Sequence, residues 1–69
     1  MVKVKLIPKG VELDINGGEL TLKEIIEVLR SELTGSDIMV IVNDRVADSW
    51  DLRVKSSDRV VVVEEFLGG

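Results

Sequence analysis

The first fifteen residues alternate between apolar and charged side chains. Residues 2–6 alternate valine or leucine with lysine, and residues 11–15 alternate valine, leucine or isoleucine with acids. A period of two is that of a strand with one buried face. Pro8 and Lys9-Gly10 supply a turn between the two runs. The pattern therefore predicts a hairpin whose lysines and acids pair on the exposed side.

After the turn Asn16-Gly17-Gly18, the apolar spacing becomes helical. Five apolar side chains recur three or four residues apart: Leu22, Ile25, Ile26, Leu29 and Leu33. This spacing places them on one face of a helix. Thr21 and Glu24 have the spacing of a capping box, and Leu20 can pack on the helix as a hydrophobic staple. Because Gly35 is a typical helix stop, we expect about three helical turns.

The second half of the chain predicts further strands. Residues 38–42 form a continuous apolar run, which is typical of a central strand covered by a helix. Asn43-Asp44 is a predicted turn, and residues 46–47 are a predicted short edge strand. Residues 48–55 are predicted to be an irregular segment or a single helical turn. Ser57-Asp58 is a second predicted turn, and residues 59–65 are the predicted last strand.

This element order predicts an α+β fold of two layers, because one helix covers only one face of a mixed four- to five-stranded sheet. It fits a ubiquitin-like β-grasp, in which the last strand lies centrally beside the first. We expect a β-grasp domain over residues 1–65 and a flexible tail over residues 66–69. The residues expected to point mainly into the core are Val4, Leu6, Leu13, Ile25, Ile26, Leu29, Val40, Val42, Val61 and Val63.

Composition narrows the possible functions. The chain has 69 residues, of which 45% are hydrophobic and 32% charged, with a net charge of -4. This length fits one small domain, and the acidic balance argues against binding to nucleic acid. No apolar run approaches the roughly 20 residues that span a bilayer, and Lys3 and Lys5 interrupt any signal-like segment. We therefore expect a cytoplasmic protein without a membrane association.

The chain has no cysteine and no histidine. It can form no disulfide framework, and it lacks the commonest acid–base and thiol nucleophile residues. Both absences argue against an enzyme. Asp44, Asp48 and Asp51 lack the spacing and glycine of a calcium-binding loop, so no metal site is predicted.

The candidate site is the C-terminal run Phe66-Leu67-Gly68-Gly69. Without Cβ atoms, its two glycines form a narrow tail that can lie extended in a channel. Four residues reach roughly 13 Å, at about 3.3 Å each. A partner can activate the Gly69 carboxylate as an acyl-adenylate, which a neighbouring side chain would obstruct. The alternative is a frayed terminus that ends in glycine by chance, at a frequency of roughly 0.5%.

Five further residues have both a functional and a structural interpretation. Phe66 and Leu67, apolar where the core should end, are better explained by a partner surface than by packing. The structural alternative is that Phe66 folds back onto the sheet. Glu64 and Glu65 can meet a basic channel mouth, or can form a charged strand end that discourages aggregation. Trp50 is either an interface anchor or a lid on the core, and the lid is favoured because aromatic residues are scarce here.

Several of these residues resemble the ThiS/MoaD family of sulfur carriers, prokaryotic relatives of ubiquitin. The similarity is clearest to the thiamin-pathway carrier ThiS and follows, in order, Val40-Ile41-Val42-Asn43, Val46, Trp50, Ser57-Asp58-Arg59-Val60 and Gly68-Gly69. Two positions depart from the family pattern. Ser57 replaces a frequent glycine, and Leu67 replaces a frequent small residue. The second departure bears on which activating enzyme fits the tail.

The resemblance implies a carrier that partner enzymes act on. An E1-like adenylating enzyme of the ThiF/MoeB type would use ATP to activate Gly69, and a sulfur donor would convert it to a thiocarboxylate. A sulfur-accepting synthase would then use that sulfur in thiamin, molybdopterin or tRNA thiolation. The carrier would bind no cofactor itself and would be monomeric when free. Two alternatives to a sulfur carrier are a ubiquitin-like modifier that is joined to lysines and a plain β-grasp interaction domain.

Overall fold

The computed structural model describes residues 1–33 and 37–65. Its elements, in chain order, are β1 (Val2–Ile7), β2 (Val11–Ile15), β3 (Glu19–Thr21), α1 (Leu22–Leu29), β4 (Asp37–Val42), β5 (Arg45–Val46), β6 (Arg53–Lys55) and β7 (Val60–Glu65). Five of the strands form one sheet in the order β2-β1-β7-β4-β5. β1 and β7 run parallel, and the other neighbours run antiparallel.

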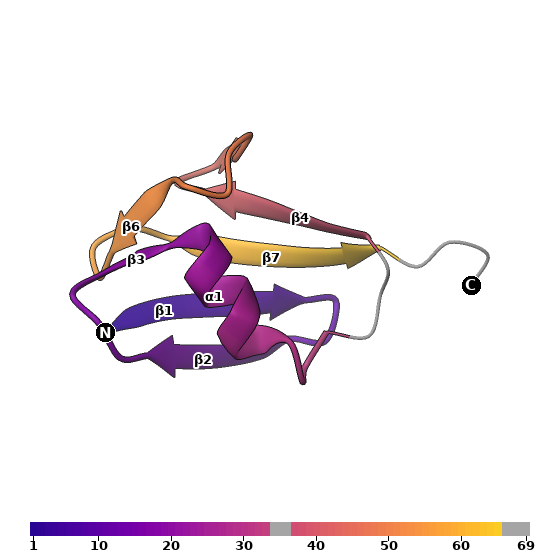
Figure 1. Cartoon of the computed structure of the whole chain (residues 1–69). Coiled ribbons are helices and arrows are strands. Elements are labelled where there is room, and N and C mark those ends of the chain that lie inside the picture. The colour runs from indigo at the N-terminus through magenta and orange to yellow at the C-terminus, as the bar shows by residue number, and fades with distance from the viewer. Residues whose placement is uncertain (34–36, 66–69) are drawn as a thin grey trace.

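Helix α1 lies across one face of this sheet (Figure 1). The predicted ubiquitin-like β-grasp is confirmed, with a mixed five-stranded sheet and the last strand beside the first. The hairpin of β1 and β2 has the expected register, with Lys3 opposite Asp14 and Lys5 opposite Glu12.

The core lies between α1 and the sheet. Its buried hydrophobic residues are Val2, Val4, Leu6, Ile15, Leu22, Ile25, Leu29, Val40, Val54, Val60 and Val62. Three predicted core residues, Leu13, Ile26 and Val42, are partly buried and pack against this cluster.

The predicted core positions Val61 and Val63 are wrong. In the parallel register with β1, Val60 lies opposite Val4 and Val62 lies opposite Leu6. The buried side chains of the two strands therefore lie side by side under α1. Because side chains alternate along a strand, Val61 and Val63 point to the other face. A one-residue error in register inverts every assignment in a strand.

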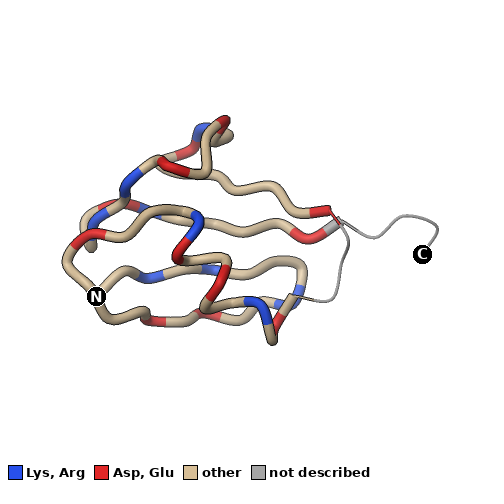
Figure 2. Tube along the Cα trace, viewed as in Figure 1, with Lys and Arg blue, Asp and Glu red and all other residues tan. Residues whose placement is uncertain are grey.

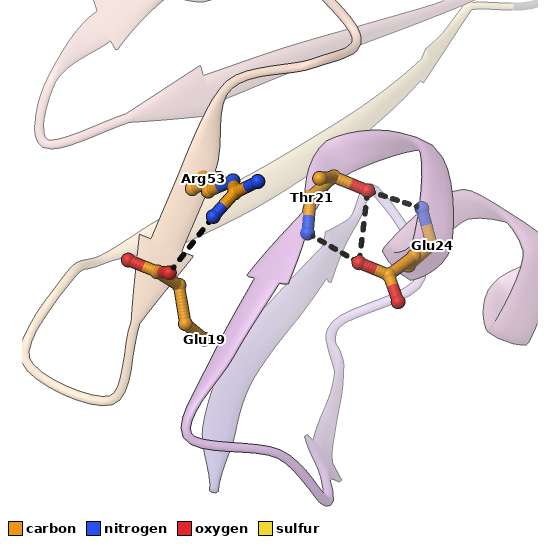
Figure 3. Close-up of polar contacts among 4 residues, drawn as sticks. All are labelled: Glu19, Thr21, Glu24 and Arg53. Atoms are coloured by element: carbon orange, nitrogen blue, oxygen red, sulfur yellow. Dashed lines mark hydrogen bonds and ion pairs between the residues drawn. The ribbon is translucent and has the colours of Figure 1, made fainter.

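The N-terminus of α1 has the predicted capping box (Figure 3). The Thr21 hydroxyl accepts a hydrogen bond from the Glu24 backbone N–H at 3.2 Å, and the Thr21 N–H donates to the Glu24 carboxylate at 2.9 Å. The bonds from the Thr21 N–H and hydroxyl lower the pKa of Glu24. Two further helix N–H groups, of Leu22 and Lys23, donate at 3.0 Å to the carbonyls of Leu52 and Trp50. The helix start is thus fixed to the loop before β6.

The helix is shorter than the sequence pattern predicts, since α1 ends at Leu29. The chain continues to Leu33 in a tightened turn, in which the N–H of Glu32 donates to the Leu29 carbonyl three residues back at 2.8 Å. Leu33 still packs against the core through this turn. The predicted stop at Gly35 lies outside the described residues.

A second, two-stranded sheet joins β3 and β6, where the sequence predicts an irregular segment or helical turn over residues 48–55. Leu20 pairs with Val54, which is fully buried. The Arg53 guanidinium and the Glu19 carboxylate lie 3.5 Å apart across this pair (Figure 3). The single valine of β6 thus closes the end of the core near the start of α1.

Replacing Thr21 by alanine is expected to reduce the free energy of unfolding by about 0.5–2 kcal/mol, because the capping acceptor is lost. Urea denaturation measures this change. Thr21→Ser, which keeps the hydroxyl, is the matched control and should retain most of the stability. Equal losses in both variants would contradict a capping role for the hydroxyl.

Candidate functional site

Strand β7 supports the candidate tail. It lies between β1 and β4 and is paired with both, so its backbone is held on two sides. The pairing with β4 continues to the last residue of β7, where Glu65 lies opposite Asp37. Phe66, Leu67, Gly68 and Gly69, the predicted tail, lie outside the described residues. The attachment point of the tail is therefore an interior strand of the sheet.

Apolar residues gather on the sheet face opposite α1. Ile7, Met39, Ile41, Val61 and Val63, which we call the apolar strip, are all partly exposed. The register brings them together, since Met39 and Ile7 both pair with Val63, and Ile41 pairs with Val61. Among residues 1–33 and 37–65, α1 is the only helix, and it covers the other face. The strip thus leads along the sheet toward the end of β7.

Charged residues border the apolar strip on one side. Lysines follow β1 and acids follow β2 in adjacent rows (Figure 2). Lys3, Lys5 and Val61 line a shallow hollow of about 440 Å³ together with Arg59. This part of the face offers both apolar contact and charge.

Glu64 does not lie on the surface as an exposed strand end. Its side chain is only 4% exposed and points to the same side as Val60 and Val62. The alternation that buries these two valines also carries Glu64 inward. Its part in partner binding, like that of Glu65, stays a prediction.

Trp50 lies at the surface beside the start of α1. Its side chain is 49% exposed, so it covers the core only in part. Its carbonyl accepts the bond from the Lys23 N–H, while its side chain lines two adjacent hollows together with Ile38. Whether Trp50 anchors a partner stays a prediction.

A hydrogen-bond network joins the two turns at the other end of β4 and β7. The Asp58 carboxylate accepts bonds from the Asn43 side-chain amide at 2.9 Å and from the Lys55 backbone N–H at 2.8 Å. The Asn43 side-chain oxygen in turn accepts from the Arg59 N–H at 2.9 Å. The Asn43 amide and the Lys55 N–H lower the pKa of Asp58. Asn43 and Asp58, which carry part of the family resemblance, thus hold the β4–β5 turn on the start of β7.

The stability of the protein should fall in acid partly because of this network. A carboxyl whose pKa is depressed by folding stabilises the native state above its unfolded pKa, and this contribution is lost as the pH falls through the folded pKa. Asp58→Asn should therefore flatten the decline in unfolding free energy between about pH 5 and pH 2. Urea denaturation across that range measures it. Identical pH profiles for the two proteins would contradict the assignment to Asp58.

Within the described residues, no group of three or more histidine, cysteine or acidic side chains is placed to hold a metal ion. In that same part of the chain, no helix is long and apolar enough to cross a membrane.

The five-stranded sheet with its central last strand and one covering helix defines a ubiquitin-like β-grasp. The crystal structure of the thiamine biosynthesis protein ThiS from Geobacter metallireducens superposes on this chain with a TM-score of 0.66. The match covers 99% of this chain and 100% of that one, at 21% sequence identity. No protein-family model and no curated protein sequence matches the chain. The likeness therefore establishes the fold.

Proposed function

We propose that this protein is a sulfur carrier whose Gly69 carboxylate is activated and converted to a thiocarboxylate by partner enzymes. The observation that carries the proposal is the fold shared with ThiS over 99% of the chain, in which the central β7 ends at Glu65, two residues before the glycine pair. A strand paired on both sides gives the tail a fixed origin, and glycines let it enter a narrow channel.

The proposed chemistry takes place at the Gly69 carboxyl group in two steps. A Gly69 carboxylate oxygen attacks the α-phosphorus of ATP on the activating enzyme, and pyrophosphate leaves. Hydrosulfide from a donor then attacks the carbonyl carbon of the acyl-adenylate, and AMP leaves with the bonding electron pair. The product is a thiocarboxylate whose ionised sulfur is nucleophilic, as thiolates are. The carrier supplies the acyl group, and its partners supply the catalytic side chains.

The apolar strip is the proposed docking face for the activating enzyme. It lies on the open side of the sheet and leads toward the end of β7, where the Phe66-Leu67 stem follows. Burial of apolar side chains drives association, and acids near the tail, including Glu65, assist approach to a basic channel mouth.

Intact mass of the protein purified from its native host tests the proposal. A sulfur carrier is expected to show a fraction in which one oxygen is replaced by sulfur. Because the chain has no cysteine, a thiol-directed alkylating reagent should label this fraction and leave the remainder unlabelled. Protein produced in a host without the activating enzyme is the control and should show neither species.

Two other outcomes would overturn the carrier function. Ladders of conjugates joined to lysines, with no sulfur-containing species, would establish a ubiquitin-like modifier instead. An unmodified mass from cells in which the activating enzyme is expressed would favour a plain interaction domain.

A further inference from the structure

The outer edge of β4 is only partly covered. Strand β5 pairs with β4 at Ile41 and Val42 alone. One more bond, from the Ala47 N–H to the Val40 carbonyl at 2.8 Å, extends this cover to residue 40. Among the described residues, nothing pairs with the outer edge of β4 at residues 37–39. The beginning of this strand, next to the end of β7, thus forms an open sheet edge (Figure 1).

Backbone geometry shows which groups this edge presents. The N–H and C=O of one residue in an antiparallel strand point to the same side, and the side alternates along the strand. Since the Val40 carbonyl points outward to Ala47, the N–H and C=O of Ile38 also point outward. The backbone of Ile38 can therefore donate one hydrogen bond to an added strand and accept one from it.

An apolar groove follows this open edge. Ile38 and Trp50 line two adjacent hollows of about 280 Å³ and 370 Å³. Ile26 of α1 contributes to the larger one, and Val46 contributes to the smaller. We call this surface the β4 groove. A strand added at Ile38 could place every second side chain toward the groove.

The rim of the β4 groove is acidic. Asp48 lines the smaller hollow and Asp51 the larger, and both are exposed, as is Asp37 at the start of β4. Glu27 also lines the larger hollow and is ion-paired with Arg30 at 3.0 Å. Lys23 is the only basic residue among the described ones that line either hollow.

We propose that the β4 groove binds an extended segment of a partner protein that adds a strand at Ile38 and carries basic and apolar residues in alternation. Main-chain bonds to an open edge give such complexes affinity, and pockets for alternate side chains give specificity. A second copy of this chain fits poorly, because pairing two β4 edges would bring two acidic rims together. The site involves none of the tail residues and is independent of the proposed carrier function.

A six-residue peptide of alternating lysine and valine, acetylated and amidated at its ends, serves as the probe. Titration into the ¹⁵N-labelled full chain should shift the amide signals of residues 38–40 and the Trp50 indole signal. The same peptide with glutamate in place of lysine should bind much more weakly. Asp48→Asn combined with Asp51→Asn should raise the Kd for the lysine peptide about fivefold at low salt.

Two variants separate the edge from the groove. Ile38→Pro removes the outward N–H of residue 38 and leaves the hydrogen bonds between β4 and β7 in place. An edge strand tolerates proline at such a position. This variant should not bind the peptide. Trp50→Ala should weaken binding, whereas Leu52→Ala, at a side chain of similar exposure (42%) outside both hollows, should not. Dispersed amide spectra confirm that each variant is folded.

Four results would overturn the proposal. These are equal binding of the glutamate peptide, shifts along β2 instead of β4, concentration-dependent shifts at residues 38–40 without peptide, and no shift at millimolar peptide. The third result would assign the edge to a second copy of this chain. A chain that lacks Gly69 should bind the peptide normally. Failure of peptide binding can therefore be distinguished from failure of the carrier function.

Discussion

Deleting Gly69, or adding one residue after it, should abolish adenylation by the cognate activating enzyme. Either change moves the carboxylate by about one residue length, roughly 3.5 Å. Reacting atoms must be placed closely for reaction, so a displacement of this size is enough to prevent it. ATP–pyrophosphate exchange measures the step directly.

The melting temperature should stay unchanged in both variants, because the altered residue follows the last strand and has no side chain to bury. Adding one residue before Met1, whose side chain is 67% exposed, is the matched control and should leave exchange intact. If the shortened and lengthened tails support exchange at the rate of the wild-type protein, the glycine pair is incidental. The interaction-domain alternative would then replace the carrier function.

Leu29→Ala should be strongly destabilising, with an expected loss of about 2–5 kcal/mol in unfolding free energy. The Leu29 side chain is fully buried between the helix and the sheet. Truncation therefore leaves a cavity in the core. The transfer free energy of the removed atoms is lost in addition. Chemical denaturation at constant pH measures the loss.

The neighbouring residue provides the control. Val28 is 58% exposed on the same helix, so Val28→Ala should change stability by only a few tenths of a kcal/mol. Similar effects at the two positions would mean that α1 does not pack on the sheet through the predicted face.

Local periodicity was sufficient to predict the hairpin and the helix start. Apolar and charged residues alternate over residues 2–6 and 11–15, and Thr21 with Glu24 marks the cap that the structure contains. Local periodicity was insufficient to predict which face of β7 is buried, because residues 60–63 are all valine. A run of valines looks the same after a one-residue shift, and only the register against β1 selects the buried face.

The same ambiguity affected the candidate site. Once Val60 and Val62 are inside, alternation buries Glu64 and exposes Val61 and Val63. Two residues of the apolar strip, Val61 and Val63, were therefore assigned to the core by the sequence pattern. Strand β6 was missed for another reason, since a single valine between two basic residues has no period to detect. Its pairing with β3 depends on tertiary contact.

The parallel pairing of β1 with β7 also sets how the protein resists mechanical load. The two strands run in the same direction, so a pull on the C-terminal tail against the N-terminus slides one strand along the other in shear. In that geometry the hydrogen bonds of the ladder bear the force together, whereas peeling would break them one after another. Forced unfolding is governed by the rate of barrier crossing, and shear raises that barrier. A force applied between the tail and the N-terminus would therefore load β7 in shear against β1.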